Sequence, residues 1–106
     1  MSQPIEALLD ELKIGLQRLY GGRLKGTYLY GSYARGEADV ESDVDVLVVL
    51  DDLPSYGLEL DRTGNLISGL SLRYGVSISR VFVSDRDWSS RMSSFLINAR
   101  AEAVPA

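Results

Sequence analysis

The octapeptide DVDVLVVL at residues 43–50 constrains the fold more than any other stretch of this chain. Its apolar residues follow Asp45 without interruption, whereas a strand with one face in water alternates apolar and polar residues. Both faces of this strand must therefore be covered, and helices are the elements that cover such a sheet. The sequence predicts an α/β (α+β) fold, in which a small mixed β-sheet has helices packed against it.

The flanking patterns predict the other large elements. Apolar residues at helical spacing predict one helix from Ile5 to the stop at residues 21–22, and another that ends at Gly75. Pro54 and Gly57 mark a loop before that second helix. The segments RLKGTYLY (residues 23–30) and VSISRVFV (residues 76–83) are rich in β-branched and aromatic residues, which predicts two further strands.

Shorter signals suggest three more features. Ser32 is a favourable capping residue, so a short helix is expected to open there and to stop by Gly36. Ser84 and Asp87 resemble a capping box at the start of a last helix. The apolar face of that helix would consist of Trp88, Met92, Phe95, Leu96 and Ala99. The tail EAVPA is expected to fray.

Composition excludes several classes of function. A length of 106 residues predicts a single domain over residues 1–106. The net charge of -4 has the wrong sign for broad nucleic-acid binding. The absence of Cys and His excludes thiol nucleophiles, disulfides and imidazole catalysis, so carboxylates, hydroxyls, Arg or Lys must carry any chemistry. The sequence offers neither a signal peptide nor a membrane-length apolar run, which favours a cytoplasmic protein with no membrane partner.

Asp43 and Asp45 are the strongest candidates for chemistry. Residues two apart in a strand share a face, so these carboxylates are expected to lie side by side and to repel each other. A hard divalent cation relieves such repulsion, and Mg²⁺ in particular binds one or two carboxylates together with substrate phosphates. The pair therefore suggests a metal site for a phosphate-bearing substrate.

Gly31, Ser32 and Arg35 are candidates for binding that phosphate. Glycine lets the backbone approach a phosphate closely, Ser32 adds a hydroxyl donor, and the guanidinium of Arg35 can pair with a phosphate oxygen. If the strand at residues 23–30 runs antiparallel to the strand at residues 43–50, these residues and the aspartates lie at the same end of the sheet. Taken alone, each feature is more often a turn or a solvated charge.

The combination is more specific. Gly31-Ser32, ten intervening residues, Asp43-Val44-Asp45 and then an apolar strand resemble the signature of the DNA polymerase β-like nucleotidyltransferase superfamily. The chain as a whole, from about residue 5 to residue 104, is similar to the minimal nucleotidyltransferase (MNT) antitoxins of HEPN/MNT toxin–antitoxin pairs.

The resemblance implies a function and a set of roles. The reaction would transfer AMP from a nucleoside triphosphate to a tyrosine of a HEPN-domain toxin. The expected nucleoside triphosphate is ATP. Asp43 and Asp45 would be catalytic and would hold Mg²⁺, while Gly31, Ser32 and Arg35 would bind the nucleotide. The superfamily adds a third acid on a later strand, and Ser77 aligns best with it. A serine there cannot act as a carboxylate base.

Other acids are poor replacements for the third carboxylate. Asp51 and Asp52 lie roughly 20 Å along the strand from Asp45, and Asp85 and Asp87 follow the strand at residues 76–83. Glu37, Asp39 and Glu41 are nearer, although a solvated acidic loop is the simpler interpretation.

Three functions remain open at this stage. The chain is either a protein adenylyltransferase, or a weak or inactive nucleotide-binding module that neutralises the toxin by direct binding. Transfer to an antibiotic or another small molecule is a third possibility, although such enzymes normally enclose the acceptor with a second domain. The apolar residues of the last helix, which include Ile97, fit either a core or a homo- or hetero-oligomeric contact.

Overall fold

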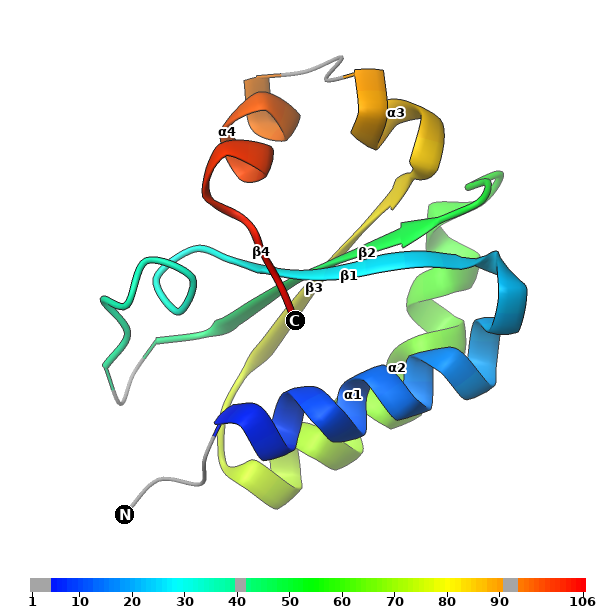
Figure 1. Cartoon of the computed structure of the whole chain (residues 1–106). Helices are drawn as coiled ribbons and strands as arrows, with labels where there is room; N and C mark the ends of the chain where they lie inside the picture. The colour runs from blue at the N-terminus through cyan, green and yellow to red at the C-terminus, as the bar shows by residue number, and fades with distance from the viewer. Residues whose placement is uncertain (1–4, 40–41, 91–93) are drawn as a thin grey trace.

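The computed structural model describes residues 5–39, 42–90 and 94–106, except the side chains of residues 94, 95 and 100. The elements, in chain order, are α1 (Ile5–Tyr20), the 3₁₀ turn η1 (Gly21–Arg23), β1 (Leu24–Tyr30), β2 (Val44–Leu50), α2 (Tyr56–Tyr74), β3 (Ile78–Ser84), α3 (Asp85–Ser90), α4 (Ser94–Glu102) and β4 (Val104–Pro105). The four strands form one sheet in the order β3-β2-β1-β4 (Figure 1). β2 and β3 are parallel, and the other two pairs are antiparallel.

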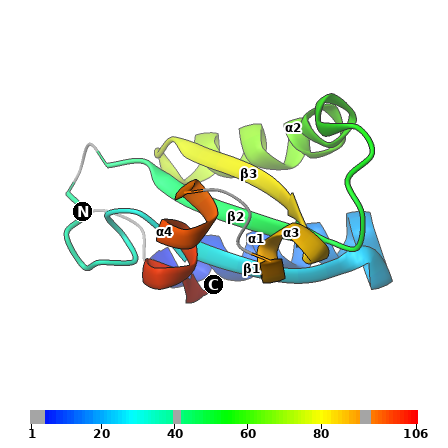
Figure 2. The same ribbon diagram turned by 90° about the horizontal axis from the view of Figure 1, so that it is seen from above.

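Helices cover both faces of the sheet, as the apolar run of β2 predicts. α1 and α2 lie on one face and α3 and α4 on the other (Figures 1 and 2). Val44, Val46 and Val48 of β2 are buried in the cluster beneath α1 and α2, whereas Leu47 and Val49 are buried in the cluster that contains residues of α3 and α4. The predicted mixed sheet with helices against it is confirmed.

The two long helices follow the sequence signals with one difference. α1 buries Leu8, Leu12 and Leu16 at helical spacing, as expected. α2 begins at Tyr56, so the prediction that Gly57 belongs to a loop is wrong. The physical reason is the N-cap at Ser55, whose hydroxyl accepts a hydrogen bond from the N–H of Leu58 and starts the helix before the glycine. Among the described helices, none has both the length and the apolar run that crossing a bilayer requires.

The C-terminal part differs more from expectation. Ser84 does accept a hydrogen bond from Asp87 N–H, but two helices, α3 and α4, are described where one was predicted. Met92 lies outside the described residues. The tail does not fray: β4 pairs with β1, and the N–H of Ala106 donates to the carbonyl oxygen of Thr27 at 3.0 Å. Pairing with an open sheet edge satisfies backbone groups that a free tail would leave to water.

A buried carboxylate links α1 and α2 at the end of the sheet where β2 terminates. Glu59 is 1% exposed and accepts hydrogen bonds from the Tyr20 hydroxyl at 2.7 Å and from Arg62 Nε at 2.9 Å. Burial opposes ionisation, but these hydrogen bonds and the charges of Arg62 and Arg23 outweigh it, so the pKa of Glu59 lies below its usual value. Burial first, and then the hydrogen bond to Glu59, raise the pKa of Tyr20.

Candidate active site

Gly31 and Asp45 bring the two halves of the sequence motif together. β1 runs antiparallel to β2 and places Tyr30 opposite Asp45, so both halves lie at the same end of the sheet, as predicted. Gly31 has a φ of 73°, a conformation that favours glycine. A Cβ at this position would overlap the Asp45 carboxylate, coming within 3.2 Å of Cγ and closer still to Oδ2. Only glycine fits here without displacing the aspartate.

Residues 31–36 form a turn, and the predicted short helix at Ser32 is wrong. Arg35 N–H donates to the Gly31 carbonyl oxygen at 3.1 Å, which closes one helical turn. Glu37 N–H then donates to the Ser32 carbonyl oxygen at 2.9 Å, and Gly36 has a φ of 72°. This is the geometry that ends helices, applied after a single turn. A full helix dipole is therefore not available at Ser32.

Asp43 and Asp45 flank the first residue of β2, and only Asp43 is exposed. Asp45 is half-buried. Burial first, and then the charge of Asp43, raise the pKa of Asp45, while Arg35 has the opposite effect. The pair therefore offers hard oxygen ligands whose charge is only partly compensated by the protein.

Ser79 lies in β3 beside the aspartates, and Ser77 immediately precedes that strand. The parallel register sets Ser79 opposite Asp45, and Val44 N–H donates to the carbonyl oxygen of Ser77 at 2.9 Å. The register and strand alternation place Ser79 on the face of the sheet that carries Asp45. This is the neighbourhood in which the resemblance expects a third acid. Within residues 5–39, 42–90 and 94–106, no group of three acidic side chains is close enough to hold a metal ion together.

The acids of the loop after β1 have other partners where they are described. Glu37 accepts from Arg35 Nε at 2.6 Å, and Asp39 accepts from the Ser42 hydroxyl at 3.3 Å. Glu41 lies outside the described residues. At the opposite end of β2, Asp51 accepts from Arg23 Nε at 3.1 Å, in agreement with the expectation that this acid is remote from Asp45.

Glu102 is a neighbour of the motif that the sequence did not suggest. Its Oε1 accepts a hydrogen bond from Gly31 N–H at 3.3 Å, and its Oε2 accepts one from Arg35 at 3.1 Å. Figure 2 shows α4 beside the loop that follows β1, at the same end of the sheet. A usable signal existed: Leu96, Ala99 and Ala103 recur at helical spacing and pack on the sheet, so the residue before Ala103 borders that face.

The aromatic residues near the motif belong to the core or its rim. Tyr28 and Tyr30 pack against the cluster under α3 and α4, and Tyr33 packs against the cluster on the other face. Tyr28 stacks on Trp88 with ring centroids 5.1 Å apart. Burial first, and then the charge of Asp45, raise the pKa of Tyr30.

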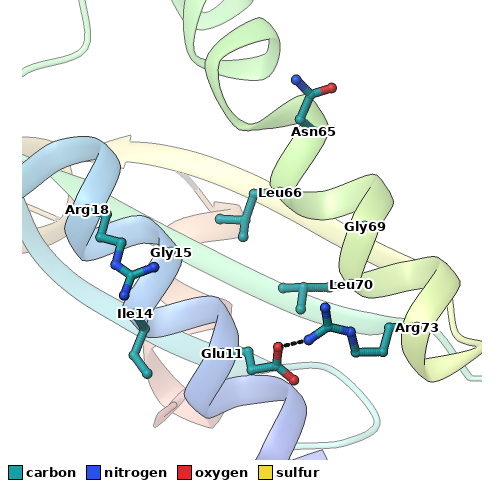
Figure 3. A pocket seen from close by; sticks show the side chains of 9 residues that line it. All are labelled: Glu11, Ile14, Gly15, Arg18, Asn65, Leu66, Gly69, Leu70 and Arg73. Atoms are coloured by element: carbon teal, nitrogen blue, oxygen red, sulfur yellow. Dashed lines mark hydrogen bonds and ion pairs between the residues drawn. The ribbon is translucent and has the colours of Figure 1, made fainter.

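A groove of about 400 Å³ lies elsewhere, between α1 and α2 (Figure 3). Glu11 of α1 and Arg73 of α2 form an ion pair across it. Gly15, Leu66 and Leu70 contribute much of its apolar wall. The helices that line it cover the face of the sheet opposite Asp45, so this groove is separate from the motif.

The sequence and fold match known proteins. The family model described as a nucleotidyltransferase domain matches residues 9–98. A candidate protein adenylyltransferase of Methanocaldococcus jannaschii is 34% identical over 88 residues, which are 83% of this chain and 82% of the relative. The protein adenylyltransferase MntA of Thermococcus cleftensis is 43% identical over 70 residues, which are 64% of this chain and 69% of that relative.

Two solved structures share the fold at low sequence identity. A toxin–antitoxin crystallised with AMP-PNP has a TM-score of 0.60 and 20% identity, and the match covers 91% of this chain and 69% of that chain. A complex of a tri-AMPylated HEPN toxin from Shewanella oneidensis with its MNT antitoxin has a TM-score of 0.52 and 21% identity, with 92% of this chain and 68% of that chain covered. At such identities the agreement concerns the fold.

Proposed function

The chain belongs to the nucleotidyltransferase domain family, and from that premise we propose that it transfers AMP from ATP to a tyrosine of a HEPN-domain toxin and acts as the antitoxin. The contact between Gly31 and Asp45 is the single observation that carries this proposal. It sets a turn with phosphate-binding chemistry directly against one of two paired carboxylates. Such an arrangement suits an Mg²⁺–triphosphate complex, because the metal would offset the carboxylates and the phosphates together.

The residues present fit Mg²⁺. Asp43 is exposed, so it can reach a hydrated ion. The raised pKa of Asp45, due first to burial and then to Asp43, indicates that a nearby cation would stabilise its charged form. In the proposed site Asp43 and Asp45 hold the metal, which supplies charge stabilisation for the phosphates. Gly31 and Ser32 contact the triphosphate, and Arg35 pairs with a phosphate oxygen.

The proposed reaction breaks one phosphoanhydride bond. The tyrosine oxygen forms a bond to the α-phosphorus of ATP, and the bond from that phosphorus to the bridging oxygen breaks. Pyrophosphate leaves with the bridging oxygen and its electron pair, and the phenolic proton passes to water. Ser77 cannot accept that proton as a carboxylate would, so we expect slow turnover: a positioned base is typically worth about 10²- to 10⁴-fold in rate.

The relatives support a protein as the acceptor. The T. cleftensis relative is named a protein adenylyltransferase, and one structure of the same fold contains an AMPylated HEPN toxin. A structure of the same fold with AMP-PNP supports an adenine nucleotide as the donor. The proposed partner is therefore a HEPN-domain toxin encoded by the adjacent gene.

A transfer assay tests the proposal. The chain is incubated with ATP labelled on the α-phosphate, Mg²⁺ and the product of the adjacent gene. The expected result is label on the partner with the wild type and none with Asp43→Asn. Asp87→Asn, which alters an aspartate at the opposite end of the sheet, is the matched control and should label normally. Equal labelling by wild type and Asp43→Asn would refute the assignment.

A second candidate function is a nucleotide-binding module that neutralises the toxin by direct contact. The observation that favours it is that the described residues contain no group of three acids able to hold a metal. In that case Asp43→Asn would still neutralise the toxin although no label is transferred. Measuring both label transfer and toxin neutralisation for the wild type and Asp43→Asn therefore separates the two functions.

A further inference from the structure

The C-terminal segment, residues 94–106, is anchored on both sides of Glu102. Before it, α4 buries Leu96 and Ala99 in the cluster on the Asp45 face of the sheet. After it, β4 pairs with β1, and the last residue of the chain donates to the carbonyl oxygen of Thr27 at 3.0 Å. Glu102 is the last residue of α4 and is thus fixed between two docked pieces. Its position beside the motif follows from that docking.

Glu102 uses the donors that the proposed site reserves for phosphate. Its two carboxylate oxygens accept from Gly31 N–H at 3.3 Å and from Arg35 at 3.1 Å. A backbone N–H next to a guanidinium is a donor pair that phosphate oxygens accept equally well. The carboxylate of Glu102 therefore stands where an anionic phosphate would stand.

The two anions cannot use this position at once. The Gly31 N–H has one hydrogen to donate, and a phosphate brought close to it would meet the negative charge of Glu102. Arg35 also pairs with Glu37 at 2.6 Å, so its guanidinium is already shared by two carboxylates. The Glu102 side chain is 34% exposed, so its carboxylate borders solvent.

We propose that Glu102 occupies a phosphate position of the nucleotide site in the free protein, and that nucleotide binding requires it to leave. The identity of the ligand rests on the proposed function. The competition itself rests on the contacts of Glu102 with Gly31 and Arg35. The chain thus carries its own competitor at the end of α4, and this competitor lowers the affinity for the triphosphate.

Calorimetric titration of Mg-ATP into Glu102→Gln tests the proposal. Glutamine keeps the size of the side chain and removes its charge, so the dissociation constant is expected to fall roughly two- to fivefold, the scale of a partly exposed charge-assisted contact. Glu37→Gln is the matched control: it also removes a carboxylate from Arg35, but Glu37 makes no hydrogen bond to Gly31 N–H. It should change the constant less than twofold. Unchanged or weaker binding by Glu102→Gln would overturn the proposal.

Amide hydrogen exchange gives a second readout. Saturating Mg-AMP-PNP is expected to speed exchange of the amides in residues 96–106 of the wild type, because release of Glu102 removes its contacts with Gly31 and Arg35 from those that hold the segment, although the burial of α4 and the pairing of β4 remain. The same amides should exchange at similar rates in Glu102→Gln with and without nucleotide. Slower exchange in the wild type on nucleotide binding would contradict release.

Tripolyphosphate without metal separates this inference from the proposed function. It probes the donors of the Gly31–Arg35 turn and does not need the aspartates to hold a cation. Tighter binding of tripolyphosphate to Glu102→Gln than to the wild type supports the competition, even if neither protein binds Mg-ATP. If Mg-ATP binds and depends on Asp45 but Glu102→Gln alters neither titration, the nucleotide site stands and this inference fails.

Discussion

The backbone of Gly31 lies against the carboxylate of Asp45, at a separation that leaves no room for a Cβ atom. Residues 14 positions apart in the sequence become neighbours because β1 and β2 pair antiparallel. This relationship makes the glycine and the aspartate one structural unit, and it yields a prediction with an internal control.

Gly31→Ala is expected to destabilise the protein more than Gly36→Ala. Both glycines have nearly the same positive φ, 73° and 72°, so each alanine meets a similar conformational cost of about 1–2 kcal/mol. Apart from its chain neighbours, no atom of the described residues lies within 4 Å of a Cβ at residue 36, whereas at residue 31 the Cβ overlaps Asp45. An additional loss of about 1–3 kcal/mol follows for Gly31→Ala. Urea denaturation measures the free energy of unfolding of each variant. Equal losses in Gly31→Ala and Gly36→Ala would contradict the close approach of Gly31 to Asp45.

Mg-AMP-PNP is expected to stabilise the wild type through Asp45. At 100 times the dissociation constant, binding adds about 2.7 kcal/mol to the free energy of unfolding. For a chain of this size the melting temperature should rise by roughly 10–20 °C. Asp45→Asn should show no such rise, while Asp87→Asn at the opposite end of the sheet should match the wild type. If the melting temperature of Asp45→Asn rose as much as that of the wild type, Asp45 would not belong to the nucleotide site.

Ser77→Asp is expected to accelerate the proposed transfer. An acid at this position would stand just before β3, next to the Asp43–Asp45 pair, and would accept the phenolic proton. The gain in the rate of label transfer should not exceed about 10⁴-fold, which is the upper range for general base catalysis. Leu72→Asp, at an exposed residue of α2, controls for added charge. No gain in Ser77→Asp would reject the alignment of Ser77 with the third acid.

Glu59→Gln is expected to lower stability at neutral pH by about 1–3 kcal/mol, since Tyr20 and Arg62 lose a charged acceptor at a buried position. The pKa of Glu59 in the folded protein is below the unfolded value of 4.5. Its contribution is therefore fully present well above pH 4.5 and is lost as the pH falls through the folded pKa. The difference between wild type and Glu59→Gln should shrink on acidification.

The exposed carboxylate of Asp10 provides the control for that measurement. It pairs with Lys13 at 3.9 Å, and Asp10→Asn should change stability by less than about 0.5 kcal/mol at any pH. The free energy of unfolding of each variant is compared with that of the wild type across the same pH range. If the loss in Asp10→Asn changed with pH as much as the loss in Glu59→Gln, the buried network around Glu59 would not be the source of the pH dependence.

Local patterns predicted most of the architecture. The apolar run after Asp45 implies burial on both faces of β2, because a half-exposed strand would alternate. Helical spacing locates α1, and the antiparallel arrangement of β1 and β2 brings Gly31 to the aspartates. Periodicity is visible in the sequence, whereas the antiparallel pairing of β1 with β2 was a condition of the sequence argument and is supplied by the structure.

Features that depend on distant contacts were missed. β4 forms because an edge of β1 is available to it, and nothing in the tail itself signals that edge. Glu102 reaches the motif across 71 residues of sequence, through the docking of α4 and β4. The turn at Ser32 and the early start of α2 have local causes instead: Gly36 adopts a positive φ that ends the turn, and Ser55 caps α2 before Gly57.

A crystal structure with Mg²⁺ and AMP-PNP would test the central claim, the nucleotide site at the Gly31–Asp45 contact, most directly. We predict metal density between the carboxylates of Asp43 and Asp45, and the triphosphate against the backbone of Gly31 and Ser32, with the Glu102 side chain displaced. Nucleotide in the groove between α1 and α2, or metal bound away from both aspartates, would contradict the account.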